Sequence, residues 1–381
     1  MYDFDEIVPR RGSDCVKWDE FPDGTLPMWV ADMDFKASPA ILKALQKRLD
    51  HGVFGYELIP DAYYDAVTSW FSRRHGWSFQ RDSIIPTTGV IAAYSACIKA
   101  LTQPGDRVIL QPPVYNCFYP AVRNNRCEAA PNTLVYEDGR YRMDLRGFEA
   151  IAADPRTKVF LLCNPHNPVG RVWTKDELAA VASICARHGV AVVSDEIHCE
   201  MLPPGKAYVP FATVAGDCSY AVCCSPTKAF NIAGIQIANI VAPDGGLRSK
   251  IDRAINENEC CDVNVFGVTA LIAAYNESEA WLDELRAYIF ENERIARYFL
   301  TSRLPRVGVP PLEGTYLMWL DCRYYGLTSD QLAKRLMERS GLMLSSGSIY
   351  GDAGDGFMRL NLASPRALVL DGLDRLEKAL S

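Results

Sequence analysis

Short apolar runs alternate with helical patterns through the middle of the chain. Four of these runs are continuous stretches bounded by turn formers, at residues 107–110, 158–163, 190–194 and 220–224. Continuous apolar strands are typical of a sheet that is buried on both faces. Because helical patterns separate them, they predict an α/β fold with a mostly parallel sheet between two layers of helices.

Helix signals are clear on both sides of these strands. Ser38 and Pro39 predict the start of a helix that carries one apolar stripe (Ile41, Leu42, Leu45 and Leu49) and ends at Gly52. The next helix is expected at about residues 60–74. Capping-box patterns mark two later helix starts, at Thr174 with Glu177 and at Thr328 with Gln331.

The chain has 381 residues, which exceeds the usual size of one hydrophobic core and predicts two domains. Residues 1–50 are expected to form an N-terminal arm and part of a small domain. Residues 51–278 would form the large domain, and residues 279–381 a linker helix and the rest of the small domain. Within the small domain, residues 315–320 and 357–362 read as strands.

Composition excludes several classes of protein. The net charge is −7 without any Lys/Arg-rich tract, which argues against binding to nucleic acid or to an anionic membrane. No apolar run approaches the roughly 18 residues that span a bilayer. The acidic start lacks the features of a secretory signal, and the 13 scattered cysteines are expected to be free thiols, so a cytoplasmic location is predicted. The pairs Cys223–Cys224 and Cys260–Cys261 lack zinc-type spacing, and no metal site is expected.

Polar residues collect where the predicted strands end. Tyr115, Asn167, Asp195 and Lys228 each follow a different strand, and ligands of such sheets bind beyond the carboxyl ends of the strands. The turn before Val90 opens a helix whose free N–H groups suit a phosphate, although a plain helix start explains the same residues. Arg359 is a lone charge in an apolar strand and needs either a salt bridge or an anionic ligand.

Several longer motifs resemble one family. They are Pro27-Met28-Trp29-Val30-Ala31-Asp32-Met33-Asp34-Phe35, Asn164-Pro165-His166-Asn167-Pro168-Val169-Gly170, Ser194-Asp195-Glu196-Ile197-His198, Ser225-Pro226-Thr227-Lys228-Ala229-Phe230-Asn231-Ile232-Ala233-Gly234 and Phe357-Met358-Arg359-Leu360-Asn361. The chain is similar to fold-type I pyridoxal 5′-phosphate (PLP) enzymes of the class I/II aminotransferase superfamily. Within it, the chain most resembles the MalY/PatB group of cystathionine β-lyases (cysteine-S-conjugate β-lyases). The resemblance implies a seven-stranded, mostly parallel sheet in a PLP-binding large domain, a smaller α+β domain, and a homodimer with shared active sites.

The resemblance also implies a role for each site residue. Lys228 would bind PLP through its amine and act as the base at the substrate Cα. Asp195 would pair with the ring nitrogen, Asn167 and His198 would lie near the ring oxygen, and Tyr115 would stack on the ring. The phosphate would be bound by Gly89, Val90, Ile91, Ser225 and Thr227. Arg359 would bind the substrate carboxylate together with Ala31, Tyr316 would be a wall of the substrate pocket, and Tyr56 would come from the second subunit.

Two positions depart from the wider aminotransferase pattern. Gln236 stands where many aminotransferases have a phosphate-binding arginine, and His198 stands where many have a tyrosine, although His198 is equally well explained as a packed structural residue. Together with the arm at residues 27–35, these positions favour β-elimination from a sulfur amino acid. Aminotransfer uses the same groups and stays the alternative. A regulatory binding role is a third hypothesis without any sequence feature of its own.

Overall fold

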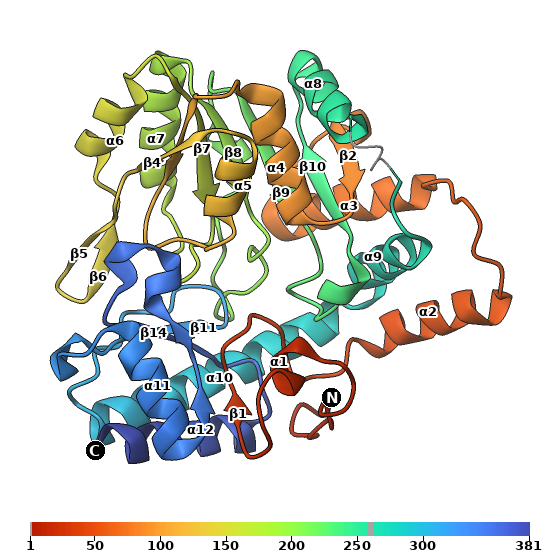
Figure 1. Ribbon diagram of the computed structural model, residues 1–381. Coiled ribbons are helices and arrows are strands. Elements are labelled where there is room, and N and C mark those ends of the chain that lie inside the picture. Colours follow the sequence, from red (N-terminus) through yellow and green to blue (C-terminus); the bar gives the residue numbers. More distant parts are fainter. Residues whose placement is uncertain (1, 258–261) are drawn as a thin grey trace.

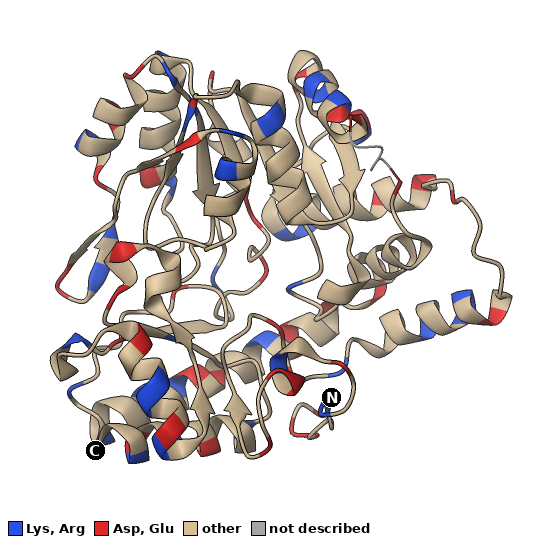
Figure 2. Ribbon diagram, in the orientation of Figure 1, with Lys and Arg blue, Asp and Glu red and all other residues tan. Residues whose placement is uncertain are grey.

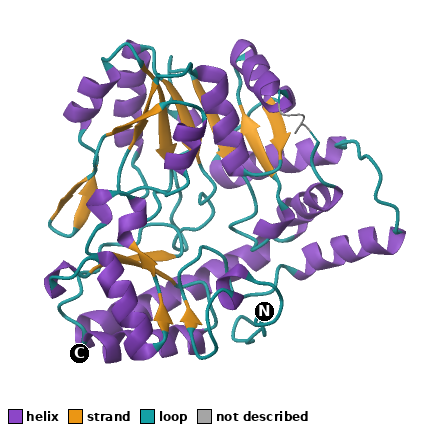
Figure 3. Cartoon of the chain, in the orientation of Figure 1, coloured by secondary structure: helices purple, strands orange, loops and turns teal. Residues whose placement is uncertain are grey.

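A seven-stranded sheet forms the centre of the larger part of the molecule (Figures 1 and 3). The computed structural model describes residues 2–257 and 262–381, so Cys260–Cys261 lies outside the described residues. The strands are, in spatial order, β2 (Ile84–Thr87), β10 (Ala238–Val241), β9 (Tyr220–Cys224), β8 (Ala191–Asp195), β7 (Thr157–Cys163), β3 (Arg107–Leu110) and β4 (Glu128–Pro131). Only β10 runs antiparallel to its neighbours in this sheet. The predicted fold class is confirmed.

Successive side chains of the strands face opposite layers of helices, as the pleat of a strand requires. On β9, Ala221 and Cys223 belong to one apolar cluster and Val222 and Cys224 to another. The first layer consists of α4 (Val90–Leu101), α5 (Phe118–Asn124) and α8 (Gly245–Asn256). The opposite layer consists of α3 (Asp61–His75), α6 (Leu145–Ala152), α7 (Lys175–His188) and α9 (Val265–Glu277). Both layers leave the carboxyl ends of the parallel strands free of helix, which is where the site lies.

The smaller part is built on a three-stranded antiparallel sheet of β11 (Leu317–Asp321), β14 (Phe357–Asn361) and β13 (Ser345–Ser346). Its helices are α10 (Glu279–Arg303), α11 (Ser329–Ser340) and α12 (Arg366–Leu380). The predicted strand at 315–320 begins two residues later. Thr315 has a left-handed backbone (φ 70°) and donates its N–H to the carbonyl of Met201, so it cannot join the ladder. Both predicted capping boxes are present.

The N-terminal arm is extended and packed, as predicted. The short strand β1 (Leu26–Pro27) pairs in parallel with β12 (Leu342–Met343), and the chain then passes between the two parts. Arg10 and Lys17, which precede the arm in the sequence, hold the arm in place, because each forms ion pairs with both Asp32 and Asp34. Its course is therefore set by buried polar contacts and not by a regular sheet.

Helix α2 (Pro39–His51) has the predicted bounds, but its predicted apolar stripe is not fully buried. Ile41 is buried, whereas Leu42 and Leu49 are each nearly half exposed, because α2 extends away from the rest of the chain and packs mainly against α9 (Figure 1). The hydroxyl of Ser38 makes no capping hydrogen bond, although the helix starts at the expected residue. The loop from α2 to α3 projects furthest from the molecule.

Charged residues of both signs are intermixed along the outer helices (Figure 2). In the described ranges, no helix combines the length and the apolar character needed to cross a membrane. Three short elements lie outside the two larger sheets: the helix α1 (Val16–Asp19) and a hairpin of β5 (Val135–Glu137) and β6 (Arg140–Arg142).

Candidate active site

A cavity of about 420 Å³ opens at the carboxyl ends of the parallel strands. It brings together most of the predicted site residues: Ala31, Gly89, Val90, Ile91, Tyr115, Asn167, Asp195, His198, Thr227 and Lys228. They come from the arm, from the start of α4 and from the ends of β3, β7, β8 and β9. The loops after adjacent parallel strands therefore converge on one place, as expected for such a sheet.

Lys228 lies four residues beyond β9, and its Nζ donates a hydrogen bond to the carbonyl of Ala31 at 2.5 Å. Burial, with a smaller contribution from the nearby Arg359 guanidinium, lowers the pKa of Lys228 to about 8 against the opposing effect of Asp32 and Asp195. A substantial fraction of the amine is then neutral near physiological pH. A neutral amine is what bond formation to an aldehyde requires.

Asp195 is the last residue of β8 and is almost fully buried, at 3% exposure. Its Oδ1 accepts one hydrogen bond from the Ile197 amide at 3.1 Å, and no cation of the described chain forms an ion pair with it. Burial raises the pKa of Asp195 to about 7, with a smaller contribution from Glu196. The carboxylate therefore lacks the positive partner that would keep it ionised.

The first turn of α4 faces the same cavity. Gly89 is the N-cap residue and offers no side-chain acceptor, so the first N–H groups of the helix have no capping partner. The Thr227 hydroxyl lies 2.8 Å from that of Ser225, which also donates to the Ile237 carbonyl at 2.6 Å. Thr227 lines the cavity and Ser225 does not, so Ser225 positions Thr227. This end of the cavity presents donors to an anion.

Arg359 enters from β14 and is 4% exposed. Its Nη1 donates to Asn167 Oδ1 at 3.0 Å and its Nη2 to the Trp29 carbonyl at 2.7 Å, while its buried Nε has no partner. No carboxylate of the described residues pairs with this guanidinium. A buried cation that lacks an anion favours the interpretation as a carboxylate site over a structural salt bridge.

His198 and Tyr316 adjoin each other near the base of the cavity. The His198 ring is buried, has no partner for Nδ1 and lies edge-on to the Tyr316 ring at 5.9 Å. Burial lowers the pKa of His198 to about 3, with Lys228 and Arg359 adding to the effect, so the imidazole is neutral. Tyr316 is fully buried and donates to the Ala31 carbonyl at 3.0 Å, which places it behind the arm and away from the lining of the cavity.

Tyr94 is a lining residue that the sequence did not reveal. It lies on α4 in an apolar pattern, so its spacing predicts a core residue, and it is indeed fully buried. Its buried hydroxyl nevertheless has no hydrogen-bond partner, and the residue is part of the lining of the cavity. Only the unpaired hydroxyl distinguishes it from an ordinary core tyrosine, and that is a property of the fold.

Tyr56 is not brought to the cavity within one chain. It is fully exposed at 103% in the loop between α2 and α3, which projects away from the sheet (Figure 1). Leu58 beside it is exposed at 90%. The predicted contribution of Tyr56 from a second subunit stays a prediction.

The residues of the cavity fit PLP. Three buried polar atoms lack partners around it, namely Tyr94 Oη, His198 Nδ1 and Arg359 Nε. The uncapped start of α4 offers N–H groups to a phosphate, and the Asp195 carboxylate lacks a cation that a protonated ring nitrogen would supply. The same cavity is lined by the Lys228 amine with its lowered pKa. The phosphate, the ring nitrogen and the aldehyde of PLP thus each have a suitable partner among the residues of the cavity.

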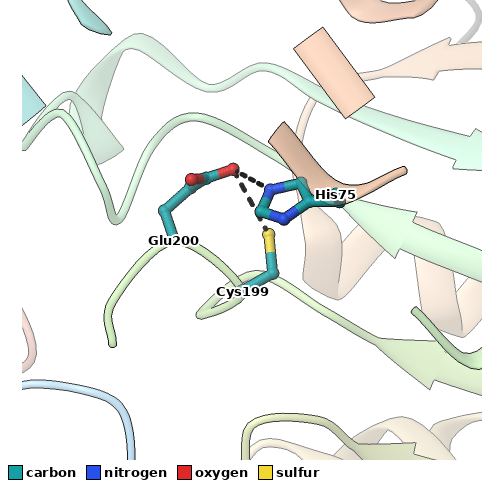
Figure 4. A group of neighbouring side chains, drawn as sticks. All are labelled: His75, Cys199 and Glu200. Carbon is teal, nitrogen blue, oxygen red and sulfur yellow. Dashed lines mark hydrogen bonds and ion pairs between the residues drawn. The ribbon is translucent and has the colours of Figure 1, made fainter. Parts of the chain in front are cut away.

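A second cluster of polar side chains lies behind the turn that follows β8. His75, Cys199 and Glu200 converge in Figure 4, with His75 Nε2 at 2.6 Å from Glu200 Oε1. The same carboxylate accepts from Trp70 Nε1 at 2.7 Å and pairs with Arg74 at 3.3 Å. Both oxygens of Glu200 are therefore occupied by donors of the chain. The cluster is an ion-pair network that fixes the turn carrying His198 to the end of α3.

Comparisons with known proteins agree with this geometry. The family model of aminotransferases of class I and II matches residues 27–376. The chain is 42% identical to cystathionine beta-lyase PatB of Bacillus subtilis, over 99% of this chain and 100% of that protein. Among solved structures, it superposes with a TM-score of 0.96 on cystalysin of Treponema denticola, which contains PLP (34% identity; 100% and 99% of the chains). The PLP-bound C-S lyase of Staphylococcus hominis gives a TM-score of 0.94 at 30% identity, over 100% and 99% of the chains.

Proposed function

Because the chain belongs to the aminotransferase class I and II family, we propose that it is a PLP-dependent C–S β-lyase. Its substrate would be cystathionine or another cysteine S-conjugate, and its products a thiol (homocysteine from cystathionine), pyruvate and ammonia. The observation that carries the proposal is the cavity lined by Lys228 and Asp195, with Arg359 bonded to the lining residue Asn167, in a chain similar over its full length to a cystathionine β-lyase.

PLP, when bound, supplies the electron sink for the Cα–H electrons of the substrate. Arg359 would bind the α-carboxylate, since its guanidinium has an unpaired Nε and no anionic partner among the described residues. Lys228 removes the Cα proton as a neutral amine and then returns a proton to the departing sulfur. Asp195 holds a proton at the ring nitrogen, which in turn keeps the carboxylate ionised. The three-carbon fragment hydrolyses to pyruvate and ammonia.

At the other end, the start of α4 and Thr227 bind the phosphate in the proposed site. Gln236 lines this end of the cavity in place of an arginine. Neutral donors and the dipole of α4 therefore do most of the binding. Tyr115 also lines the cavity and would stack on the ring, while Asn167 would donate to the ring oxygen.

The proposal includes a homodimer in which Tyr56 of one subunit completes the cavity of the other. A fully exposed tyrosine beside an exposed leucine, on a loop that projects from the molecule, supports this arrangement. Large apolar side chains exposed together mark a surface that a partner covers. A cytoplasmic location belongs to the same proposal, and the free thiols among the described cysteines support it.

The test is a product assay on the pure protein with cystathionine and a panel of cysteine S-conjugates, without any keto acid. Release of pyruvate, ammonia and a thiol supports lyase activity. Turnover only when a keto acid is present would replace it by the aminotransferase alternative, which the family description also allows. In the variant Lys228→Ala, the visible absorbance of the lysine-linked cofactor is expected to vanish and activity to fall at least a thousandfold.

A further inference from the structure

The carbonyl oxygen of Ala31 accepts two hydrogen bonds from opposite sides. Lys228 Nζ donates at 2.5 Å from the turn after β9, and Tyr316 Oη donates at 3.0 Å from just before β11. A carbonyl oxygen has two lone pairs, so both donors are accommodated at once. The larger and the smaller part of the molecule thus meet at one backbone atom of the arm.

The peptide units around Ala31 are held by two asparagines. Asn361 Nδ2 donates to the carbonyls of Val30 at 2.7 Å and Asp32 at 2.6 Å, the residues that flank Ala31. Asn231 accepts from the Met33 amide at 3.0 Å and donates to the Met33 carbonyl at 2.9 Å. Backbone groups of the arm are thereby paired with side chains because no neighbouring strand is available to pair them. These hydrogen bonds restrain the arm around Ala31, whereas the Ala31 carbonyl itself accepts from Lys228 and Tyr316.

We propose that the Ala31 carbonyl is the hydrogen-bond acceptor of the Lys228 amine whenever the lysine is not joined to the cofactor. Tyr316 is a positioning residue that keeps this carbonyl directed at the lysine. The inference rests on the proposed role of Lys228. Between removing the Cα proton and delivering one to sulfur, the lysine is an ammonium on a flexible stem. A carbonyl oxygen holds an ammonium by a hydrogen bond and does not take its proton, so the proton stays available for the sulfur.

Other charged and titratable groups face Lys228 from several elements. Arg359 on β14 opposes the charged amine, whereas Asp32 on the arm, Asp195 on β8 and Cys117 before α5 favour it. The neutral His198 ring also lies near. The variant Tyr316→Phe changes none of these groups. Its effect on the lysine therefore reports on the carbonyl alone.

The test measures the pH midpoint of amine labelling at Lys228 in the full-length, cofactor-free protein, by mass spectrometry of the labelled peptide. In Tyr316→Phe the carbonyl is less well directed and the ammonium loses part of its hydrogen bond. The midpoint is expected to move down by about 0.3–1 pH unit. In the holoenzyme, kcat is expected to fall about three- to tenfold while KM stays within about twofold.

Tyr63→Phe is the matched control. Tyr63 is equally buried and loses one hydrogen bond, to Asn239 Oδ1 at 2.7 Å, away from the lining of the cavity. It should leave the midpoint unchanged. Asn361→Ser is the second variant, in case Tyr316→Phe does not fold, and should move the midpoint in the same direction. A wild-type midpoint in a folded Tyr316→Phe protein would overturn the inference. Retention of the visible band by Lys228→Ala would instead overturn the proposed function.

Discussion

Asp195 ends β8 and Glu200 lies five residues later, in the turn that follows. Both are buried, and their surroundings have opposite effects on their pKa. Burial raises the pKa of Asp195 to about 7, because one amide is its hydrogen-bond donor and no cation pairs with it. Burial would raise the pKa of Glu200 as well, but His75 and Arg74 lower it to about 2. The two carboxylates differ in their partners and not in their depth.

This difference separates a binding residue from a structural one. Glu200 is paired with the Arg74 guanidinium and hydrogen-bonded to His75 (Figure 4), so its charge is satisfied on folding. Asp195 is left without one in a cavity that fits PLP, so folding leaves a cost that a cationic ligand removes. Arg359 shows the same property with the opposite sign, since its Nε has no partner and no carboxylate among the described residues pairs with it. A buried charge without its counter-ion indicates where a ligand binds.

The largest expected effect is on stability and comes from Glu200→Gln. Removing the charge takes from Arg74 its buried partner and leaves it the more exposed Glu279 and Asp283, so the loss is expected at the lower end of the cost of breaking a buried pair, about 3 kcal/mol. Urea unfolding monitored by circular dichroism measures the loss. The kcat of the folded protein should stay within about twofold, because Glu200 does not line the cavity. A large fall in kcat at unchanged stability would reverse the roles assigned to the two carboxylates.

The sequence predicted the sheet and most of the site because both depend on local patterns. Continuous apolar strands and their polar ends led to Tyr115, Asn167, Asp195 and Lys228, and the cavity is lined by all four. The alternation of strands and helices predicts a parallel sheet, and in such a sheet the residues that follow the strands lie at the same edge. Resemblance to a family then supplied the roles that spacing alone does not contain.

What the sequence could not show depends on contacts between distant segments. Tyr316 was expected as a wall of the pocket, yet it lies behind the arm because its hydroxyl finds the Ala31 carbonyl 285 residues away. Tyr94 reads as a core residue, and only its unpaired hydroxyl marks it. The opposite roles of Asp195 and Glu200 were equally hidden, since Arg74 and His75 come from α3, more than 120 residues earlier.

Asp195→Asn is expected to have the next largest effect, on the reaction and not on the fold. The amide keeps the size of the side chain but cannot balance a protonated ring nitrogen, so kcat should fall about a hundred- to a thousandfold. Stability of the cofactor-free protein at pH 7 should be unchanged or higher, because a buried carboxylate without a cation is lost. Steady-state kinetics and urea unfolding of the same preparations measure both. If Asp195→Asn and Glu200→Gln lost similar amounts of kcat and of stability, the two carboxylates could not be divided into a binding residue and a structural one.

Taken per pH unit, the smallest expected effect is a pH dependence of opposite sign at the two carboxylates. Since the folded pKa of Asp195 is raised to about 7, the folded cofactor-free protein binds an extra proton at this carboxyl between about pH 4 and 7, and the contribution of Asp195 to stability falls as pH rises through that window, by at most about 1.4 kcal/mol per pH unit. His198, with a pKa lowered by burial to about 3, contributes with the opposite sign. Burial also raises the pKa of Glu196 to about 7, so Glu196 changes stability with pH in the same direction as Asp195. The variant Asp195→Asn retains this contribution of Glu196. Glu200 contributes stability that is present above its unfolded pKa and is lost as pH falls towards 2.

Urea unfolding from pH 4.5 to 7.5, with and without PLP, isolates the contribution of Asp195 to the pH dependence of stability. The bound ring nitrogen keeps that carboxylate ionised and should therefore remove its part of the pH dependence. An identical slope in wild type and Asp195→Asn would show that the buried carboxylate finds a cation within the chain after all, and with it the contrast to Glu200 would disappear.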